Sequence, residues 1–448
     1  MRLIVTPGNP LRGSARVPGD KSLSHRALLF GALASGESRI GNFLVSGVTK
    51  VMLDALAALG VDWTLDENIL RVKGKGFAGL RSPNTALNCG NSATTIRMMA
   101  GALAAAGIEA VLDGSPGLRR RPMERIVEPL RCMGVPVEAS EGGTAPLRLG
   151  ARPTGKKLSA AVLDLPVSSA QVKTCLLLAA LAADGETVLY EPGPSRDHTE
   201  RMLRSMGVEV ESRIVEWGGR VLYETHIMPL ETALKPVEMN LPGDISAAAF
   251  LIVAATITPG SDISIAGVSI NPTRTGIVDA LRGMGAEIEI VETGQQAGEP
   301  VGDLRVRYAQ LVGGRVDGAL VVRMIDEFSV FGSAAACAEG DSIVRDASEL
   351  RYKESDRIHT LCEELGRLGV VTEEADDGFT IHGGTPGGGT VQSHGDHRLA
   401  MAMTVAGLAA RAPVIVEGAE IIDESFPAFM ETLCRLGANI SVEEDNPV

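Results

Sequence analysis

One local pattern recurs six times along the chain. In each copy an amphipathic run of Leu, Ala, Val, Ile or Met ends at a glycine, and an apolar residue follows that glycine. A glycine at this place predicts the C-terminal cap of a helix, where the backbone turns left-handed, and the next apolar residue predicts a strand. The glycines are spaced 74, 73, 78, 84 and 68 residues apart: Gly60, Gly134, Gly207, Gly285, Gly369 and Gly437. Such repetition predicts one supersecondary unit per copy.

A second kind of helix alternates with the first. It is apolar on all sides, as in residues 175–181, and a helix of that character is predicted to be buried. Short polar stretches open its six copies near Gly19, Gly90, Val167, Gly243, Asp326 and Gly395. The sequence therefore predicts six α/β units, each with one buried and one surface helix. Two groups of three form the simplest partition, because each group has the size of a domain.

Composition excludes several classes of protein. The net charge of −14 and the aromatic content of 3% make a poor nucleic-acid binder. The apolar run 247–257 is shorter than the roughly 20 residues that span a bilayer. The first residues lack the apolar core of a signal peptide, and the six cysteines show no CxxC spacing. We expect a cytoplasmic protein whose cysteines are reduced, buried and inert.

Cations cluster where the buried helices begin. Helix N-termini offer unpaired N–H groups and a partial positive charge, so they bind anions. Any one cluster could consist of helix caps and surface ion pairs. Their recurrence at equivalent repeat positions predicts a site for a small polyanion with phosphate and carboxylate groups, which Arg binds bidentately. The clusters are residues 21–26, 91–97, 119–121, 168–173, 196, 351–357 and 396–398.

Two carboxylates, Asp326 and Glu354, stand among these cations. Acid–base chemistry on a hydroxyl and a carbon would use such groups. The spacing also allows a structural interpretation, in which Asp326 caps a helix and Glu354 pairs with Arg357 at i,i+3. The sequence leaves both open.

Two further patterns carry no chemistry. Residues 74–79 match GxGxxG but open no helix, so a turn is expected. His394 and His397 have no further metal ligand at suitable spacing, so no metal is expected.

The polar motifs of this sequence resemble those of the 5-enolpyruvylshikimate-3-phosphate (EPSP) synthase family. They follow the family's order from residue 18 to residue 427: 18–26, 90–94, 121–123, 169–171, 271–276, 353–357, 396–398 and 425–427. The resemblance implies an α/β fold, a two-domain inside-out α/β barrel with six βαβαββ units, three per domain. The buried helices would point their N-termini at the interdomain cleft. Domain I would comprise residues 1–19 plus 241–448, and domain II residues 20–240.

The resemblance also implies a reaction. The enolpyruvyl group of phosphoenolpyruvate would pass to the 5-hydroxyl of shikimate 3-phosphate in the shikimate pathway, through a tetrahedral intermediate, with release of phosphate. The implied protein is a monomer without cofactor or metal, and its partners are these two small molecules, with no nucleic acid and no membrane.

The family's functional residues map onto matching positions of this sequence. The implied catalytic residues are Asp326, Glu354 and Lys21. Those for shikimate 3-phosphate are Lys21, Ser22, Arg26, Ser169, Ala170, Gln171, Arg196, Asp326 and Lys353. Those for phosphoenolpyruvate or its inhibitory analogue glyphosate are Lys21, Asn91, Ala93, Arg121, Gln171, Arg357 and Arg398.

Three positions depart from the pattern of many members. Ala93 replaces a glycine, which resembles the glyphosate-tolerant class of these enzymes. Glu424 stands near a lysine of some members, and Glu349 stands where some have an asparagine. Neither polar change removes a core catalytic group.

Two other functions are compatible with parts of this pattern. A UDP-N-acetylglucosamine enolpyruvyl transferase would have a similar fold but carries a reactive cysteine in the loop that here is residues 115–121, which contains none. A non-catalytic anion-binding protein could use the same fold, because fold alone does not fix function.

Overall fold

The chain divides into two units in the computed structural model, which describes residues 1–443. Unit 1 comprises Met1–Pro18, Pro242–Gly294 and the residues from Pro300 onward. Unit 2 comprises Gly19–Leu241 and Gln295–Glu299. The expected domain boundaries fall after residues 19 and 240. The chain passes between the units after residues 18 and 241, so each of these two boundaries differs by one residue.

The short segment Gln295–Glu299 is a difference from the expected division. It is the turn end of a hairpin formed by β16 (Glu287–Gln296) and β17 (Glu299–Arg307), whose other residues belong to unit 1. Arg201 of unit 2 donates from Nη1 to Gly298 O at 2.8 Å, which holds this turn. No local sequence pattern predicts such a contact.

Within residues 1–443, each unit contains three four-stranded sheets. Unit 2 has the orders β14-β3-β5-β4, β6-β7-β9-β8 and β10-β11-β13-β12. Their bounds are β3 (Ser35–Gly41), β4 (Asp62–Asp66), β5 (Ile69–Lys75), β6 (Leu87–Asn88), β7 (Ala110–Asp113), β8 (Val137–Ser140), β9 (Thr144–Leu149), β10 (Val162–Asp164), β11 (Thr187–Glu191), β12 (Val210–Trp217), β13 (Arg220–Ile227) and β14 (Glu238–Asn240).

Unit 1 has the orders β22-β23-β1-β24, β16-β17-β15-β2 and β18-β19-β21-β20. The bounds not yet given are β1 (Arg2–Thr6), β2 (Arg12–Ala15), β15 (Asp262–Ser269), β18 (Arg315–Val316), β19 (Asp341–Val344), β20 (Val371–Ala375), β21 (Gly378–His382), β22 (Gly389–Gln392), β23 (Val414–Glu417) and β24 (Asn439–Glu443).

All six sheets contain one parallel pair at an edge, as between β6 and β7. Around β6 and β10 the chain order is strand, helix, strand, helix, strand, strand, the βαβαββ pattern. Three sheets take one strand from a distant part of the chain. The N-terminal strands β1 and β2 complete two sheets of unit 1, and β14 completes the first sheet of unit 2.

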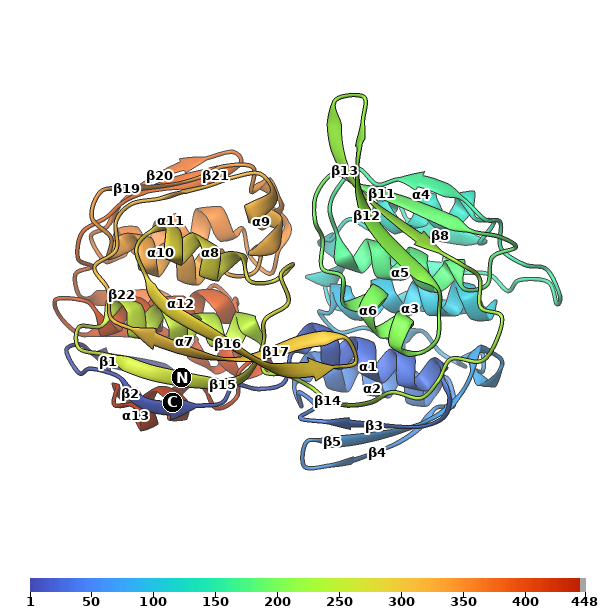
Figure 1. Ribbon diagram of the computed structural model, residues 1–448, viewed down its shortest axis with the longest axis horizontal. Coiled ribbons are helices and arrows are strands. Elements are labelled where there is room, and N and C mark those ends of the chain that lie inside the picture. The colour runs from blue at the N-terminus through green and yellow to red at the C-terminus, as the bar shows by residue number, and fades with distance from the viewer. Residues whose placement is uncertain (444–448) are drawn as a thin grey trace. The chain divides into compact units, whose positions relative to one another are not determined.

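The predicted buried helices lie inside the two units, with the sheets around them (Figure 1). Each unit has its own core of Ala, Leu, Val, Ile, Met and Phe side chains. Among residues 1–443, no helix has both the length and the apolar character that crossing a bilayer requires. The six buried helices are α1 (Lys21–Leu33), α3 (Ala93–Ala106), α5 (Ala170–Ala180), α7 (Ile245–Ile257), α10 (Phe328–Ala336) and α12 (His397–Leu408).

The outer helices end as the glycine pattern predicts. All six glycines have a positive φ, between 76° at Gly369 and 115° at Gly437. The residue after each glycine donates its N–H to the carbonyl five residues back, as from Val61 to Leu56 O at 3.0 Å, which defines the Schellman motif. These helices are α2 (Gly47–Ala58), α4 (Glu124–Cys132), α6 (His198–Ser205), α8 (Gly276–Gly283), α11 (Arg357–Arg367) and α13 (Phe429–Leu436).

Two smaller expectations are resolved by the structure. Residues 74–79 form the end of β5 and a single 3₁₀ turn, Phe77–Gly79, so the GxGxxG match is a turn. All six cysteines are free thiols. Cys89, Cys175 and Cys362 are buried, as expected, and Cys337 is partly buried. The expectation is wrong for Cys132 and Cys434, which are exposed near the ends of the outer helices α4 and α13.

Replacing Gly369 with alanine should destabilise unit 1 by about 1–2 kcal/mol, because a Cβ disfavours the left-handed backbone at φ 76°. No neighbour lies within 4 Å of the added Cβ, so strain in the backbone is the whole effect. Gly366 is the matched control, since it lies inside α11 and its added Cβ also meets nothing within 4 Å. Gly366→Ala should stabilise by about 0.5–1 kcal/mol. Equal thermal midpoints of the two variants would contradict this.

Candidate active site

The first turns of α1 and α5 lie together in unit 2. Arg26 of α1 is 2% exposed and donates from Nε to Thr199 Oγ1 and from Nη2 to Thr174 Oγ1, both at 2.9 Å. Its Nη2 also lies 3.4 Å from the carbonyl of Ala170, the first residue of α5. Burial and then the charge of Arg196 lower the pKa of Arg26 to about 10, so it remains a cation at neutral pH. This guanidinium joins three helices at the place where α1 and α5 begin.

A second buried arginine joins α3 to α5. Arg97 donates from Nη1 to Gln171 Oε1 at 2.6 Å, and Gln171 donates from Nε2 to Thr94 Oγ1 at 2.9 Å. Arg97 Nη2 also donates to Pro122 O at 2.9 Å, which brings the loop containing Arg121 to the same place. Arg97 belongs to one of the predicted cation clusters but is not among the predicted site residues. Its only signal was a charged residue one turn into an otherwise apolar helix.

A buried ion cluster supports the segments that carry Ser169 and Arg196. Lys173 Nζ lies 2.9 Å from Glu191 Oε2 and 2.8 Å from Glu200 Oε1. Glu191 in turn accepts the N–H of Ser169 at 3.2 Å and the hydroxyl of Ser195 at 2.8 Å. Burial would lower the pKa of Lys173, but the two carboxylates outweigh it and raise that pKa. The sequence does not show this cluster because its three members lie on different elements, α5, β11 and α6, which come together only in the folded unit.

Lys21 and Ser22, in the first turn of α1, are more exposed than this cluster. Lys21 is the first residue of α1 and is partly exposed, while Asp20 before it is fully buried and accepts the N–H of Leu23 at 2.8 Å as the helix cap. Arg196 donates from Nη1 to Ser22 Oγ at 3.3 Å. Lys21, Ser22 and Arg196 thus provide two cations and a hydroxyl beside the α1 start.

The predicted phosphoenolpyruvate residues of unit 2 follow one another around the α3 start. Asn91 is exposed, and its Oδ1 accepts the hydroxyl of Ser115 at 3.0 Å. Ala93 is 5% exposed and is the first residue of α3. Of the loop arginines, Arg119 pairs with Asp113 at 2.5 Å, whereas Arg121 is partly buried and precedes the proline that Arg97 binds.

Unit 1 places Asp326 among three cations just before α10. Its Oδ1 lies 3.7 Å from Arg357 Nη1 and 3.9 Å from Lys353 Nζ, and its Oδ2 lies 3.8 Å from Arg398 Nη2. Arg398 also donates from Nη1 to the backbone carbonyl of Asp326 at 2.9 Å, which fixes α12 to the α10 start. The carboxylate is 18% exposed. Asp326 is not the helix cap that one interpretation allowed, because the residue at the cap position is Glu327.

Arg357 is the centre of this arrangement. It is 3% exposed and donates from Nη2 to Glu354 Oε2 at 2.7 Å and from Nε to Asp396 Oδ2 at 2.7 Å. The i,i+3 pair of Glu354 and Arg357 is therefore present, and Glu354 remains 23% exposed. Burial alone would raise the pKa of Asp396 and lower that of Arg357. The charge of Arg357 instead lowers the pKa of Asp396. The charges of Asp396, Glu354 and Asp326 raise the pKa of Arg357. Among the described residues, Arg357 Nη1 has no hydrogen-bond partner.

Another buried arginine ties α7 to the same end of unit 1. Arg274 is 1% exposed and lies 2.8 Å from Ser246 Oγ and 3.2 Å from Asp244 Oδ1, at the start of α7. Ser246 also bonds to Glu327, which precedes α10. The starts of α7, α10 and α12 thus gather in unit 1, as those of α1, α3 and α5 do in unit 2.

The two polar departures lie beside this set. Glu424 ends a 3₁₀ segment, Ala419–Glu424, and its Oε2 lies 3.8 Å from His397 Nδ1. Glu349 lies partly buried in another, Ser348–Tyr352, directly before Lys353.

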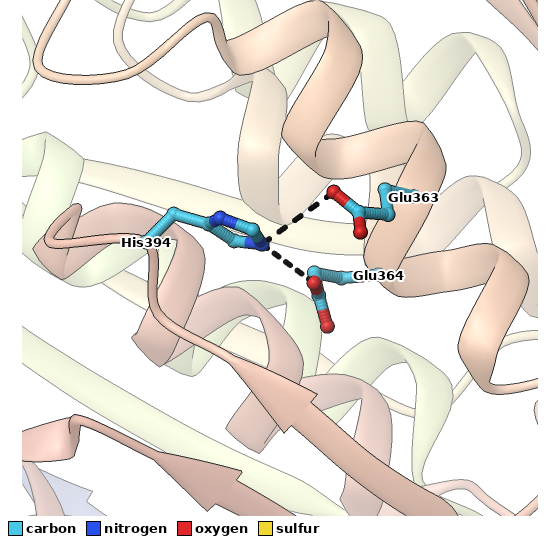
Figure 2. Close-up of side chains that lie close together, drawn as sticks. All are labelled: Glu363, Glu364 and His394. Atoms are coloured by element: carbon cyan, nitrogen blue, oxygen red, sulfur yellow. Dashed lines mark hydrogen bonds and ion pairs between the residues drawn. The ribbon is translucent and has the colours of Figure 1, made fainter.

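One group of potential metal ligands occurs in the described residues. Glu363, Glu364 and His394 bring one ligand atom each within 4.8 Å of one another (Figure 2). Their neighbour Arg367 donates to Glu363 Oε1 at 2.8 Å and lies 3.5 Å from Glu364 Oε1. A guanidinium and a histidine already occupy these carboxylates, so the group is an ion-pair network in this structure.

Comparison with known structures defines the class of protein. The enolpyruvyl transferase NikO from Streptomyces tendae is 21% identical and has a TM-score of 0.77, with 98% of each chain covered. At this identity the likeness shows that the two chains have similar folds. The EPSP synthase from Acinetobacter baumannii is 38% identical with a TM-score of 0.86, covering 99% of this chain and 100% of that one.

Sequence comparison specifies the family. A model of the family "EPSP synthase (3-phosphoshikimate 1-carboxyvinyltransferase)" matches residues 5–433. The 3-phosphoshikimate 1-carboxyvinyltransferase of Halorhodospira halophila is 48% identical over 444 residues, covering 98% of this chain and 97% of the relative. That of Coxiella burnetii is 44% identical over 440 residues, covering 97% of both. The chain belongs to the EPSP synthase family.

Proposed function

We propose that this chain transfers the enolpyruvyl group of phosphoenolpyruvate to the 5-hydroxyl of shikimate 3-phosphate and that the residues described above do so with the following roles. In unit 2, the α1 and α5 starts bind shikimate 3-phosphate through Lys21, Ser22, Arg26, Ser169, Ala170, Gln171 and Arg196. In unit 1, Asp326 and Lys353 bind the same substrate. Phosphoenolpyruvate and glyphosate contact Lys21, Asn91, Ala93, Arg121, Gln171, Arg357 and Arg398.

Charge balance explains why so many cations are needed. Both substrates are polyanions, and their repulsion must be offset before a bond can form between them. Arg26, Arg97, Arg274 and Arg357 are all buried, so their positions are fixed by hydrogen bonds before a ligand arrives. Arg357 Nη1, which has no hydrogen-bond partner among the described residues, is a donor well suited to a carboxylate or phosphate oxygen.

The addition step needs a base at oxygen and an acid at carbon. Asp326 accepts the proton of the 5-hydroxyl, because it is a partly exposed carboxylate whose oxygens have three cations within 4 Å. Glu354 or Lys21 delivers a proton to the methylene carbon, and elimination removes a proton from the resulting methyl group while phosphate leaves. No cofactor enters these steps.

The arrangement of Asp326 with Lys353, Arg357 and Arg398 is the observation that carries this proposal. Phosphate release from phosphoenolpyruvate tests it, with shikimate 3-phosphate and UDP-N-acetylglucosamine compared as acceptors. Release with shikimate 3-phosphate alone is the expected result. No release from a folded sample that binds shikimate 3-phosphate would show a binding protein and refute the roles of Asp326 and Glu354.

Replacing Ala93 with glycine should increase glyphosate sensitivity. Glyphosate is slightly longer than phosphoenolpyruvate, and removing one methyl group from a tight subsite changes affinity by about 10–200-fold. The expected result is a glyphosate inhibition constant at least about tenfold lower, with a smaller change in KM for phosphoenolpyruvate. Ala106→Gly, at the other end of α3, is the control for weakening the helix. Equal inhibition constants for the wild type and Ala93→Gly would contradict the prediction.

A further inference from the structure

A buried glutamate and an exposed histidine lie beside the segment that leads into α12. This segment, residues 393–396, follows β22 and ends at Asp396, the cap of α12. His394 within it has φ 49°, in the left-handed region, and its Nε2 lies 2.6 Å from Glu364 Oε1 (Figure 2). A non-glycine residue in this region is uncommon and needs neighbouring contacts to hold it.

Glu364 holds the segment at a second point. Its carboxylate is fully buried, and Oε2 accepts the N–H of Gln392, the last residue of β22, at 2.8 Å. One carboxylate therefore fixes both the end of β22 and the residue that makes the turn after it.

The same helix also binds the far end of the segment. Arg357 and Glu364 are seven residues apart on α11, about two turns, so they lie on one face. Arg357 bonds to Asp396, while Glu364 bonds to Gln392 and His394. Asp396 also accepts the N–H of Arg398 at 2.9 Å. The position of the Arg398 backbone thus depends on a segment held by α11 at both ends.

We infer that Glu364 and His394 are positioning residues of the phosphoenolpyruvate subsite. Together they fix residues 393–396, so that Asp396 meets Arg357 and Arg398 lies beside Asp326. This inference rests on the proposed roles of Arg357 and Arg398. Neither positioning residue touches substrate, and displacement of a binding group by about 1 Å is enough to lower a rate about 100-fold.

His394→Asn isolates the contact with Glu364. Asparagine tolerates the left-handed backbone better than most residues, but its side chain is too short to replace the histidine. We expect KM for phosphoenolpyruvate to rise about tenfold or more, with KM for shikimate 3-phosphate within about twofold of wild type. A rise in both KM values to the same extent, or in neither, would overturn the inference.

Two variants of Glu364 add a rescue test. In Glu364→Gln, Oε1 can still accept the N–H of Gln392 and the amide can donate to His394, so kinetics close to wild type are expected. Glu364→Ala removes both contacts and should reproduce or exceed the effect of His394→Asn. Equal kinetics of Glu364→Gln and Glu364→Ala would contradict a positioning role.

His382 provides a matched control. It lies in the same unit on β21 and contacts two carboxylates, Asp341 at 2.8 Å and Glu373 at 3.2 Å. His382→Asn should leave both KM values unchanged. An increase in KM for phosphoenolpyruvate equal to that of His394→Asn would overturn the specific role of His394.

Hydrogen exchange separates this inference from the proposed function, because it is measured without substrate. In His394→Asn, the amides of Asp396 and Arg398, which donate to Ser393 O and Asp396 Oδ1, should exchange faster than in the wild type. The amides of α10 should not change. Unchanged exchange at residues 396 and 398 would refute the inference, whichever substrate this part of the site binds.

Discussion

Replacing Asp326 with asparagine should lower kcat by about 100–10,000-fold, the usual contribution of a positioned acid or base. Asparagine keeps the shape of the side chain but cannot accept the proton of an alcohol. The dissociation constant of shikimate 3-phosphate should stay the same or fall, because three cations near Asp326 lose an opposing charge. Phosphate release gives the rate, and calorimetry gives the dissociation constant.

This pair of measurements distinguishes catalysis from binding. Asp317→Asn is the control, since Asp317 is an exposed carboxylate of unit 1 that pairs with Arg315 at 2.6 Å. It should leave kcat unchanged. A kcat for Asp326→Asn within tenfold of wild type would exclude Asp326 as the base and leave Glu354 or Lys21 to move the proton.

Replacing Lys173 with methionine should produce the largest loss of stability. Breaking a buried ion pair by removing one partner costs about 3–5 kcal/mol, because the other charge stays buried. Here two carboxylates, Glu191 and Glu200, are each 1% exposed and would lose the same partner. KM for shikimate 3-phosphate should also rise, since Glu191 holds the segments of Ser169 and Arg196. Thermal unfolding and steady-state kinetics measure the two effects.

The loss should depend on pH in a defined direction. Burial already raises the pKa of Glu200, and Lys173 opposes that rise. Without Lys173 the folded-state pKa moves further above the unfolded value of about 4.3. A carboxylate with a raised folded-state pKa favours folding at low pH, and this contribution is lost as pH rises. Lys173→Met should therefore be less destabilised at about pH 5 than at about pH 8.

A second substitution checks the cause. Adding Glu200→Gln to Lys173→Met removes one of the two stranded charges, so part of the stability should return and the pH dependence should weaken. If the double variant is no more stable than Lys173→Met, the loss comes from packing and not from charge.

The repeat made most of the fold predictable. A glycine C-cap needs a positive φ, and Gly60, Gly134 and the equivalent glycines could be recognised from their neighbours alone. The buried position of apolar helices such as α7 could also be predicted, because an all-apolar helix has no face suited to solvent. The strand exchange that brings β1, β2 and β14 into their sheets could not be derived from residues, since it depends on pairing over more than 190 positions, as between Arg39 and Glu238.

The sequence could predict which of the proposed site residues lie at helix starts. Lys21, Ser169 and Arg398 lie there because first turns leave N–H groups unpaired. The supporting residues were not predictable by the same reasoning. Arg97, Lys173 and Glu364 lie inside helices, and their partners become visible only when α3, α5 and α11 are packed against other elements. A charged residue inside an apolar helix gives only a weak signal, because the sequence does not show what it faces.

The pairing of β1 with β24 suggests a circular permutant of this sequence. Arg2 of β1 pairs with Glu443 of β24, so the two ends of the described chain meet in one sheet. A circular permutant that joins the two ends and opens between Leu241 and Pro242 would place β1 and β2 after β24. The two parts of unit 1 that Gly19–Leu241 now separates would then follow one another along the chain. Apart from Gln295–Glu299, each unit would then be synthesised without interruption. In the natural order β1 and β2 are synthesised more than 240 residues before the strands with which they pair, as Arg12 is before Asp262.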